Sequence, residues 1–566
     1  MTYALPTSAL ETLDWTWEHF APLYADLAAR PIDGETLDGW LRDWTQVSDL
    51  FGETYARLSV ATTRDTTDTI AETRFMRMLR KIYPQAMAAE QELRQKLLAS
   101  SLEPAEFAVP LRKMRAEAEL FREDNLPLLA ETSRLAKEYN KLIGAQTVSW
   151  EGEERTLTQL RPLLQSDDRA LRERVWQVSA TRQLEDRTAI NTIWQQLFEL
   201  RQRIAAQADK PDYRAYSWQA MRRFDYTADD CLRFHDAIEQ LVVPAAERVY
   251  ARRRQQLGVD TLRPWDLEAP LPGVPALTPF TTVQELEERS EAALRKVDAT
   301  FGDYFATMRR EDLLDLDNRK GKAPGGYCAT FEVVKRPFIF MNAVGLADDV
   351  RTILHEAGHA FHAFEAAQLA YNQQRDVPME FAEVASMAME LLAAPYLKHS
   401  DGGFYGEEAY VRARIEHLED MLCFWPYMAV VDGFQHWAYT HTQLATDATQ
   451  CDRAWDALWQ RFMRGQDWSG LDDERVTGWH RKLHLYGYPF YYVEYGLAQL
   501  GAVQVWRNAL HDQPGAVAAY RSALALGGKR GLPDLFAAAG GRFAFDVETV
   551  GEAVELLENT IAELGA

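Results

Sequence analysis

VRTILHEAGHAFHAFE, at residues 350–365, contains the most informative motif of the sequence. Its apolar residues predict a buried helix, on which His355, Glu356 and His359 form an HExxH pattern. Positions i and i+4 share one helix face, so both imidazoles can reach one metal ion, and Glu356 can take a proton from a water molecule there. Buried polar side chains without partners are costly, which favours a metal site over a chance match. Gly358, in the same helix, predicts close approach of another backbone.

The third metal ligand stays open on spacing alone. A catalytic zinc ion takes three protein ligands and keeps a fourth position for water. The longer pattern HExxHxxGxxH fails here, because His362 and Glu365 occupy the positions three and six after His359. The apolar helix expected over residues 378–390 instead offers three glutamates that could return to the histidines: Glu380, Glu383 and Glu390.

A second group of chemically active side chains follows near the C-terminus. Residues 484–495, HLYGYPFYYVEY, contain one histidine and five tyrosines. Their N–H and O–H groups could stabilise a developing oxyanion, while the simpler interpretation is a buried aromatic helix. Tyr492 and Tyr495 are three positions apart, so we expect them to face the same way.

Most of the remaining chain predicts helices. Helix-forming residues or helical spacing extend over the ranges 11–140, 169–207, 229–254 and 283–308. Five prolines interrupt residues 257–282 and predict a long irregular connection. Residues 327–342 are β-prone and end in the apolar PFIFMN, which predicts a small antiparallel sheet. The expected fold class is therefore mainly α.

Composition argues against several kinds of partner and compartment. The 566 residues carry 62 Lys and Arg against 85 Asp and Glu, and this net charge of −23 has the wrong sign for nucleic acid or an anionic membrane. Neither a signal peptide nor an apolar run of about 20 residues is evident, so we expect a cytoplasmic protein. The four cysteines form no CxxC pair, which predicts buried reduced thiols rather than disulfides or a cysteine zinc site.

These motifs together resemble a known family. The main ones are HEAGHAFH at 355–362, FAEVASM at 381–387 and LHLYGYPFYYVEYGLAQLGA at 483–502, with support from GKAPGGYC at 321–328, PFIFMN at 337–342 and RPWD at 263–266. The chain resembles the oligoendopeptidase F and thimet oligopeptidase family of zinc metallopeptidases, and is most similar to its bacterial oligoendopeptidase branch. The likeness covers roughly residues 263–502, and the N-terminal third matches only in helical character.

The resemblance implies a fold and a metal site. The fold is a helical ellipsoid with a deep substrate channel and a small antiparallel β-sheet beside the HExxH zinc helix. Residues 1–205 would form one wall of the channel, and residues 206–566 would form the zinc metallopeptidase region. One zinc ion per chain would be held by His355, His359 and Glu383.

The resemblance also implies catalytic roles. Glu356 would be the general base, and the C-terminal segment would stabilise the oxyanion and position the substrate through His484, Tyr488, Tyr492 and Tyr495. The distance from the histidine to the tyrosines is one residue shorter than in the thimet-type pattern, so Tyr491 competes with Tyr492. His362 matches a histidine that is not a zinc ligand in the family.

The expected function is cleavage of internal peptide bonds in short unfolded peptides by a zinc metalloendopeptidase. Oligopeptides are the expected partners, nucleic acid and membranes are not, and the oligomeric state stays open. Three alternatives stay open: a helical zinc carboxypeptidase, an inactive peptide-binding protein and a structural zinc site. The intact Glu356 argues against the second, and the lack of a cysteine near the HExxH pattern argues against the third.

Overall fold

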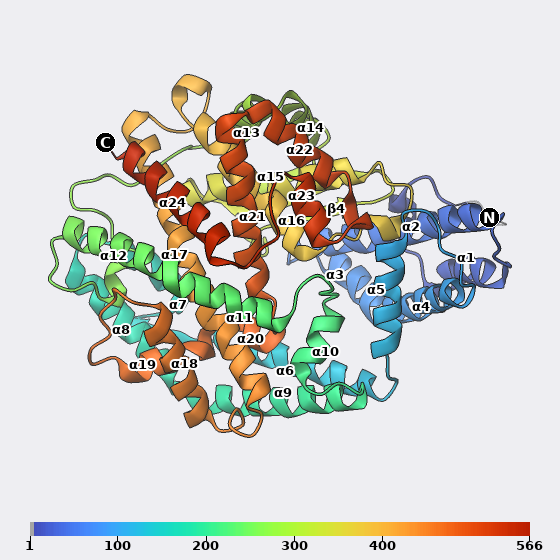
Figure 1. Cartoon of the computed structure of the whole chain (residues 1–566), viewed down its shortest axis with the longest axis horizontal. Coiled ribbons are helices and arrows are strands. Elements are labelled where there is room, and N and C mark those ends of the chain that lie inside the picture. The colour runs from blue at the N-terminus through green and yellow to red at the C-terminus, as the bar shows by residue number, and fades with distance from the viewer. Residues whose placement is uncertain (1–4, 566) are drawn as a thin grey trace. The chain divides into compact units, whose positions relative to one another are not determined.

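The computed structural model describes residues 5–565, which form two compact units. Unit 1 comprises Met1–Ala118, Leu277–Ala413 and Ala498–Phe543, and unit 2 comprises Glu119–Ala276, Arg414–Leu497 and Ala544–Ala566. Helices make up most of both units, which confirms the prediction of a mainly helical fold (Figure 1). The predicted division at residue 205 falls inside unit 2, so units and predicted regions divide the chain differently. That residues 1–205 form the wall of a channel stays a prediction.

Unit 1 begins with helices packed around an aromatic core. They are α1 (Trp17–Ala29), α2 (Leu37–Arg64), α3 (Thr69–Arg77), α4 (Tyr83–Ala99) and α5 (Ala108–Leu120), with a 3₁₀ turn at Ala9–Thr12 and a π-helical turn at Met78–Ile82. Large side chains such as Phe20 and Trp44 are buried among them. The buried carboxylate of Glu90 accepts hydrogen bonds from Trp44 Nε1 and Ser48 Oγ, each at 2.8 Å. This buried charged group is thereby hydrogen-bonded, as buried polar groups require.

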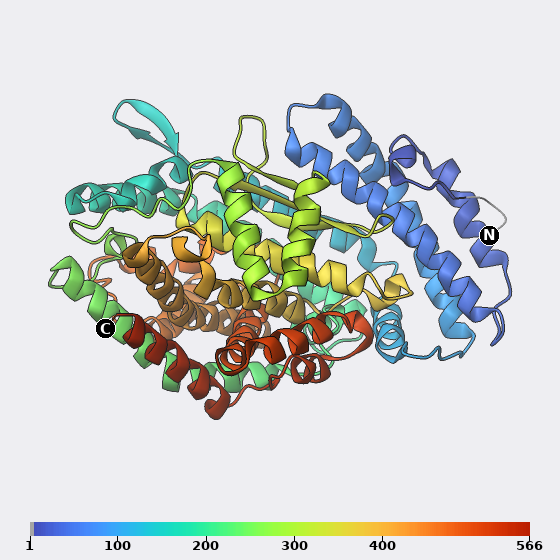
Figure 2. The same ribbon diagram turned by 90° about the horizontal axis from the view of Figure 1, so that it is seen from above.

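A three-stranded sheet occupies the middle of unit 1. Strands β3 (Leu314–Asp317), β4 (Tyr327–Phe331) and β5 (Arg336–Ala343) lie in the order β3-β5-β4. The antiparallel pairing of β4 with β5 confirms the prediction, while β3 runs parallel to β5 and makes the sheet mixed. Next to the sheet, α13 (Val283–Val297) and α14 (Ala299–Arg310) form a pair of neighbouring helices (Figure 2).

Two helices follow the sheet directly. α15 (Ala347–Ala366) carries the HExxH pattern and packs on β4 and β5, and α16 (Met379–Ala393) packs along α15 (Figure 1). The unit is completed by the C-terminal part of α21 (Tyr492–His511), by α22 (Gln513–Leu524) and α23 (Leu532–Ala538), and by 3₁₀ turns at Asn372–Gln374, Ala394–Tyr396, His399–Asp401 and Gly527–Lys529.

Unit 2 contains most of the remaining helices. They are α6 (Asn125–Gly144), α7 (Leu157–Leu160), α8 (Arg169–Glu185), α9 (Arg187–Gln207), α10 (Tyr213–Ala220), α11 (Ala228–Ala237), α12 (Val243–Leu257), α17 (Glu407–Thr440, which begins in unit 1), α18 (Ala448–Phe462), α19 (Asp472–Val476), α20 (Leu483–Gly487) and α24 (Val547–Leu564). The predicted helical stretch 169–207 is two helices, and a π-helical turn at Ile238–Val242 joins the two that cover 229–254. Further 3₁₀ turns are Arg161–Gln165, Pro264–Asp266 and Gly478–Arg481.

One hairpin of unit 2 was missed by the sequence prediction. β1 (Thr147–Trp150) pairs antiparallel with β2 (Glu153–Thr156) inside a stretch with no strong strand pattern. The two residues between them, Glu151 and Gly152, have positive φ angles of 53° and 86°, which suits a tight hairpin turn. Among the described residues, no helix is both long and apolar enough to cross a membrane.

Candidate active site

The predicted metal ligands lie where α15 and α16 touch. The start of α15 is held by Asp349, whose Oδ2 accepts hydrogen bonds from the backbone N–H groups of residues 344–346 at 2.8–2.9 Å. A Cβ atom on Gly358 would lie 2.5 Å from the carbonyl oxygen of Ala385 and 2.6 Å from the Cα of Ser386. Glycine is thus needed for the two backbones to meet, as the sequence predicted, and this contact sets the distance between the side chains of the two helices.

Three of the predicted ligands converge at this contact. Glu383 Oε2 lies 3.4 Å from His355 Nε2 and 3.7 Å from His359 Nε2, and the three side chains offer ligand atoms within 4.8 Å of one another. Ligands bonded about 2.0 Å from a tetrahedral zinc ion are about 3.3 Å apart, so the spacing fits such an ion. Two imidazoles and a carboxylate are also a known catalytic donor set for zinc. Of the three glutamates left open by the sequence, Glu383 is the one in this group.

Neighbouring polar groups orient these side chains. Glu390 Oε1 lies 2.7 Å from His355 Nδ1, so the imidazole can donate a hydrogen bond from Nδ1 while its Nε2 faces Glu383. Ser386 Oγ lies 3.1 Å from Glu383 Oε2. The sequence analysis considers Glu390 only as an alternative metal ligand. Its position seven residues after Glu383, on the same helix face, indicates that it lies near the same histidines, and in the structure it contacts His355.

The carboxylate of Glu356 is poised to exchange a proton near neutral pH. Burial, opposed by His355 and reinforced by Glu383 and Glu390, raises the pKa of Glu356 to about 7. Its Oε2 is buried and has no hydrogen-bond partner among the described residues. An oxygen in that state is suited to receive a proton or a polar group of a ligand.

The histidines of α15 differ in their electrostatics. Burial lowers the pKa of His359 to about 4, so its imidazole is neutral at pH 7, the form in which histidine binds metals. Burial also acts on His355, but its contacts with Glu383 and Glu390 outweigh it and raise the pKa of His355. His362 lies outside the group of three ligands, and burial lowers its pKa to about 3.

The predicted histidine and tyrosines of the C-terminal segment form a group in unit 2. The ring of His484 is centred 4.9 Å from Tyr492, 6.1 Å from Tyr491, 6.2 Å from Tyr495 and 6.4 Å from Tyr488. Tyr488 is 63% exposed, whereas Tyr492 is 6% exposed. The structure therefore brings the three predicted tyrosines and the competitor Tyr491 around the imidazole of His484.

A lysine that the sequence had not singled out joins this aromatic group. Lys482 Nζ lies 3.9 Å from the ring centre of Tyr492 and 4.9 Å from that of Tyr427. Burial lowers the pKa of Lys482 to about 8, and burial together with the Lys482 charge lowers the pKa of His484 to about 4. The imidazole is therefore neutral at pH 7, when it can donate a hydrogen bond from one nitrogen only.

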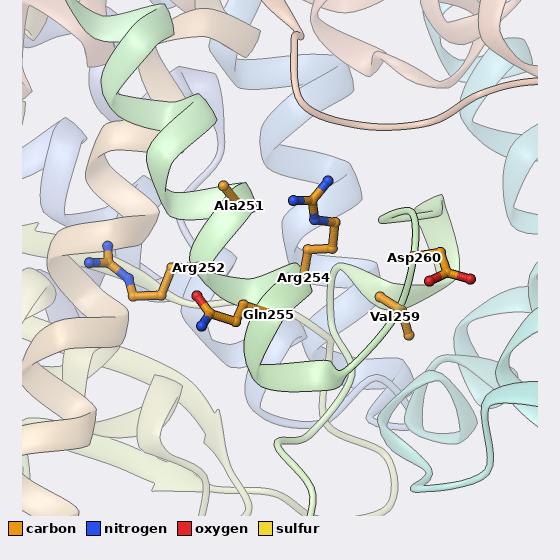
Figure 3. Close-up of a pocket in the computed structure, with 6 residues that line it drawn as sticks. All are labelled: Ala251, Arg252, Arg254, Gln255, Val259 and Asp260. Carbon is orange, nitrogen blue, oxygen red and sulfur yellow. The ribbon is translucent and has the colours of Figure 1, made fainter.

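A separate surface hollow of unit 2 contains none of the predicted residues. It lies at the end of α12 and the loop that follows, and is lined by Ala251, Arg252, Arg254, Gln255, Val259 and Asp260 (Figure 3). Arg252 within it pairs with Glu419 at 2.8 Å. The hollow offers no cluster of catalytic or metal-binding side chains, so the site on α15 and α16 remains the candidate active site.

Comparison with known protein families identifies the family of this chain. The model of peptidase family M3 matches residues 162–552, which is more than half of the chain. The chain belongs to peptidase family M3. The family resemblance read from the HExxH, FAEVASM and C-terminal motifs is thereby confirmed.

Individual relatives of this M3 family member agree with the match. The chain is 28% identical over 176 residues to an oligoendopeptidase F homolog of Mycoplasma genitalium, and 28% identical over 159 residues to the oligopeptidase PepF of Bacillus subtilis. These matches cover 29% and 27% of this chain but only 28% and 23% of the relatives. The structure of PZ peptidase A with an inhibitor superposes over 99% of this chain and 98% of that chain, at 26% identity and a TM-score of 0.85.

Proposed function

We propose that this chain is a zinc-dependent oligoendopeptidase that hydrolyses internal peptide bonds of short unfolded peptides. The observation that carries the proposal is the group His355, His359 and Glu383 on two touching helices, with the unpaired Glu356 carboxylate one residue from the first ligand. Membership of peptidase family M3 supports the same activity. Oligopeptide substrates and a cytoplasmic location remain predictions from the sequence.

Each side chain of the site has a defined task under this proposal. His355, His359 and Glu383 would hold one zinc ion, with the Nδ1 contact of Glu390 fixing the orientation of His355. When bound, zinc supplies a Lewis acid that lowers the pKa of a coordinated water toward neutrality. Glu356 takes the proton from the attacking water and later delivers it to the leaving amine. A carboxylate whose pKa is about 7 can do both at neutral pH.

The C-terminal aromatic group would assist through hydrogen bonds. The rings of Tyr492 and Tyr495 lie beside that of His484, and O–H donors such as theirs can stabilise the oxyanion that forms as the carbonyl is attacked. The assignment rests on the family motif, and Tyr491 and Tyr488 are its competitors within the same group.

Cleavage of an internally quenched peptide with both ends blocked tests the proposed activity. The wild-type chain should cut it at internal bonds, a zinc chelator should abolish the cleavage, and added zinc should restore it. Mass spectrometry of the products then identifies the bond. Release of single C-terminal residues from unblocked peptides alone would instead indicate a carboxypeptidase, and peptide binding without products would indicate an inactive binding protein.

Replacement of Tyr492 by phenylalanine tests the oxyanion role. Removal of one such donor typically lowers kcat by roughly 10²–10³-fold, so Tyr492→Phe should lower kcat much more than it raises KM. Tyr488→Phe, which changes the most exposed ring of the group, is the matched control. A change in KM alone would make Tyr492 a binding residue, and an effect only in Tyr488→Phe would reassign the donor.

A further inference from the structure

A second group of potential metal ligands lies in unit 2. Cys231 and His235 come from α11, and Asp432 and His436 come from α17 (Figure 1). Each helix contributes a pair at positions i and i+4, so each pair shares one helix face, as the two histidines of α15 do. Cys231, Asp432 and His436 offer ligand atoms that all lie within 4.8 Å of one another.

The distances from Asp432 to the two histidines are close to those between ligands of a tetrahedral metal site. Asp432 Oδ2 lies 3.0 Å from His235 Nε2 and 3.2 Å from His436 Nε2. Neighbouring ligands of a tetrahedral zinc ion are about 3.3 Å apart when each is bonded at about 2.0 Å. These contacts are at ion-pair distance, and both Nε2 atoms and both Asp432 carboxylate oxygens have no further hydrogen-bond partner within residues 5–565. A carboxylate that faces two imidazoles in this way is an arrangement in which lone pairs can converge on one cation.

Burial makes the missing hydrogen bonds costly. Asp432 is completely buried, and His235 and His436 are 2% and 3% exposed. Aromatic rings lie beside the imidazoles: Trp218 and Phe490 are 5.6 Å and 5.5 Å from His436. A carboxylate without hydrogen bonds in such surroundings needs a compensating positive charge.

We propose that Cys231, Asp432 and His436 bind a zinc ion that holds α11 against α17, with His235, 3.0 Å from Asp432 Oδ2, beside them as a candidate fourth ligand. Sulfur, nitrogen and oxygen ligands in one site are typical of zinc. Cys231, Asp432 and His436 are all buried, which excludes a substrate, so this zinc is structural rather than catalytic. Its ligand set is also distinguishable from that of α15 and α16, because it alone includes sulfur.

Metal analysis of the full chain tests the proposal first. Protein produced with added zinc and dialysed without chelator should contain two zinc ions per chain. The variant His355→Ala should lose the zinc of the candidate active site and keep one ion. X-ray absorption at the zinc edge of that variant should show one sulfur neighbour at about 2.3 Å. A zinc environment of nitrogen and oxygen alone, or a variant without zinc, would overturn the proposal.

A pair of cysteine variants identifies the sulfur. In the His355→Ala chain, Cys231→Ser should remove the zinc–sulfur signal, whereas Cys451→Ser, at another buried cysteine of unit 2, should keep it. Persistence of the signal in the Cys231→Ser protein would contradict the assignment. If the Cys231→Ser protein does not fold, the presence or absence of a sulfur neighbour at zinc in His355→Ala alone tests the proposal. Two zinc ions in His355→Ala, one of them bound to sulfur, would refute the proposed active-site ligand and leave this site intact.

Discussion

The two groups of metal-ligating side chains are built alike but differ in exposure. In each, helical pairs at positions i and i+4 meet a carboxylate from another helix. The side chains of His355 and His359 are 25% and 22% exposed to solvent, whereas those of Asp432 and His436 are 0% and 4% exposed. Under the two proposals, exposure to solvent accompanies the reactive site and burial accompanies the structural one.

A second difference lies beside the ligands. Glu356 stands next to the ligands of unit 1 as a carboxylate with an unpaired oxygen, and it is not one of them. The group in unit 2 uses its only carboxylate, Asp432, as a proposed ligand. The proposed general base therefore accompanies the accessible group and not the buried one, as expected if only the former carries out hydrolysis.

Removal of the carboxylate ligand should have the largest effect. Glu383→Ala should lose the accessible zinc and reduce kcat/KM by roughly 10⁴-fold or more, because zinc supplies most of the rate enhancement. The matched control is Glu380→Gln, at another buried glutamate of α16, which should keep both zinc and activity. Zinc analysis and peptide kinetics on both variants decide which glutamate is the ligand. Loss of zinc from Glu380→Gln alone would exchange their roles.

A smaller effect is expected from the partner of His355. Groups that orient a metal-binding histidine typically contribute 10–100-fold to metal affinity, so Glu390→Gln should weaken zinc binding by roughly that factor. Titration with a competing chelator measures the change. The sulfur-bound zinc proposed for unit 2 serves as an internal control, because Glu390 belongs to unit 1. Equal weakening of both zinc ions would show that the variant acts through the stability of the whole chain.

The smallest effect concerns a buried histidine whose environment needs no metal. His480 Nε2 lies 2.7 Å from Asn191 Oδ1, and burial lowers the pKa of His480 to about 3. The unfolded chain, with a pKa near 6.5, binds more protons than the folded chain between about pH 3 and pH 6.5, so stability falls as the pH falls through that window. At pH 5 the loss relative to pH 8 is about 2 kcal/mol.

Urea unfolding at the two pH values measures this loss. His480→Gln should reduce the pH dependence by about that amount, whereas His441→Gln, at an exposed position, should not. An unchanged pH dependence in His480→Gln would show that other groups dominate. His480 is thus a reference for the buried histidines of the two proposed metal sites, because it is stabilised by an ordinary hydrogen bond.

Features with a local signal could be predicted from the sequence. Features that depend on contacts between distant segments could not. The HExxH pattern, the helix that returns Glu383 and the close contact at Gly358 follow from spacing within about forty residues. The residues of β3 and of the hairpin after α6 have weak strand patterns. Their pairing depends on tertiary packing, so it could not be predicted from the sequence. The pair Cys231 and His235 is about two hundred residues from the pair Asp432 and His436. Their proximity therefore appears only once α11 and α17 are packed together.

The central claim is tested most directly by Glu356→Gln, measured for zinc content and turnover on the same sample. The variant keeps the shape of the side chain and all three proposed ligands but cannot accept a proton. The account predicts unchanged zinc content and a fall in kcat of roughly 10²–10⁴-fold. Unchanged zinc content with turnover close to that of the wild type would contradict it.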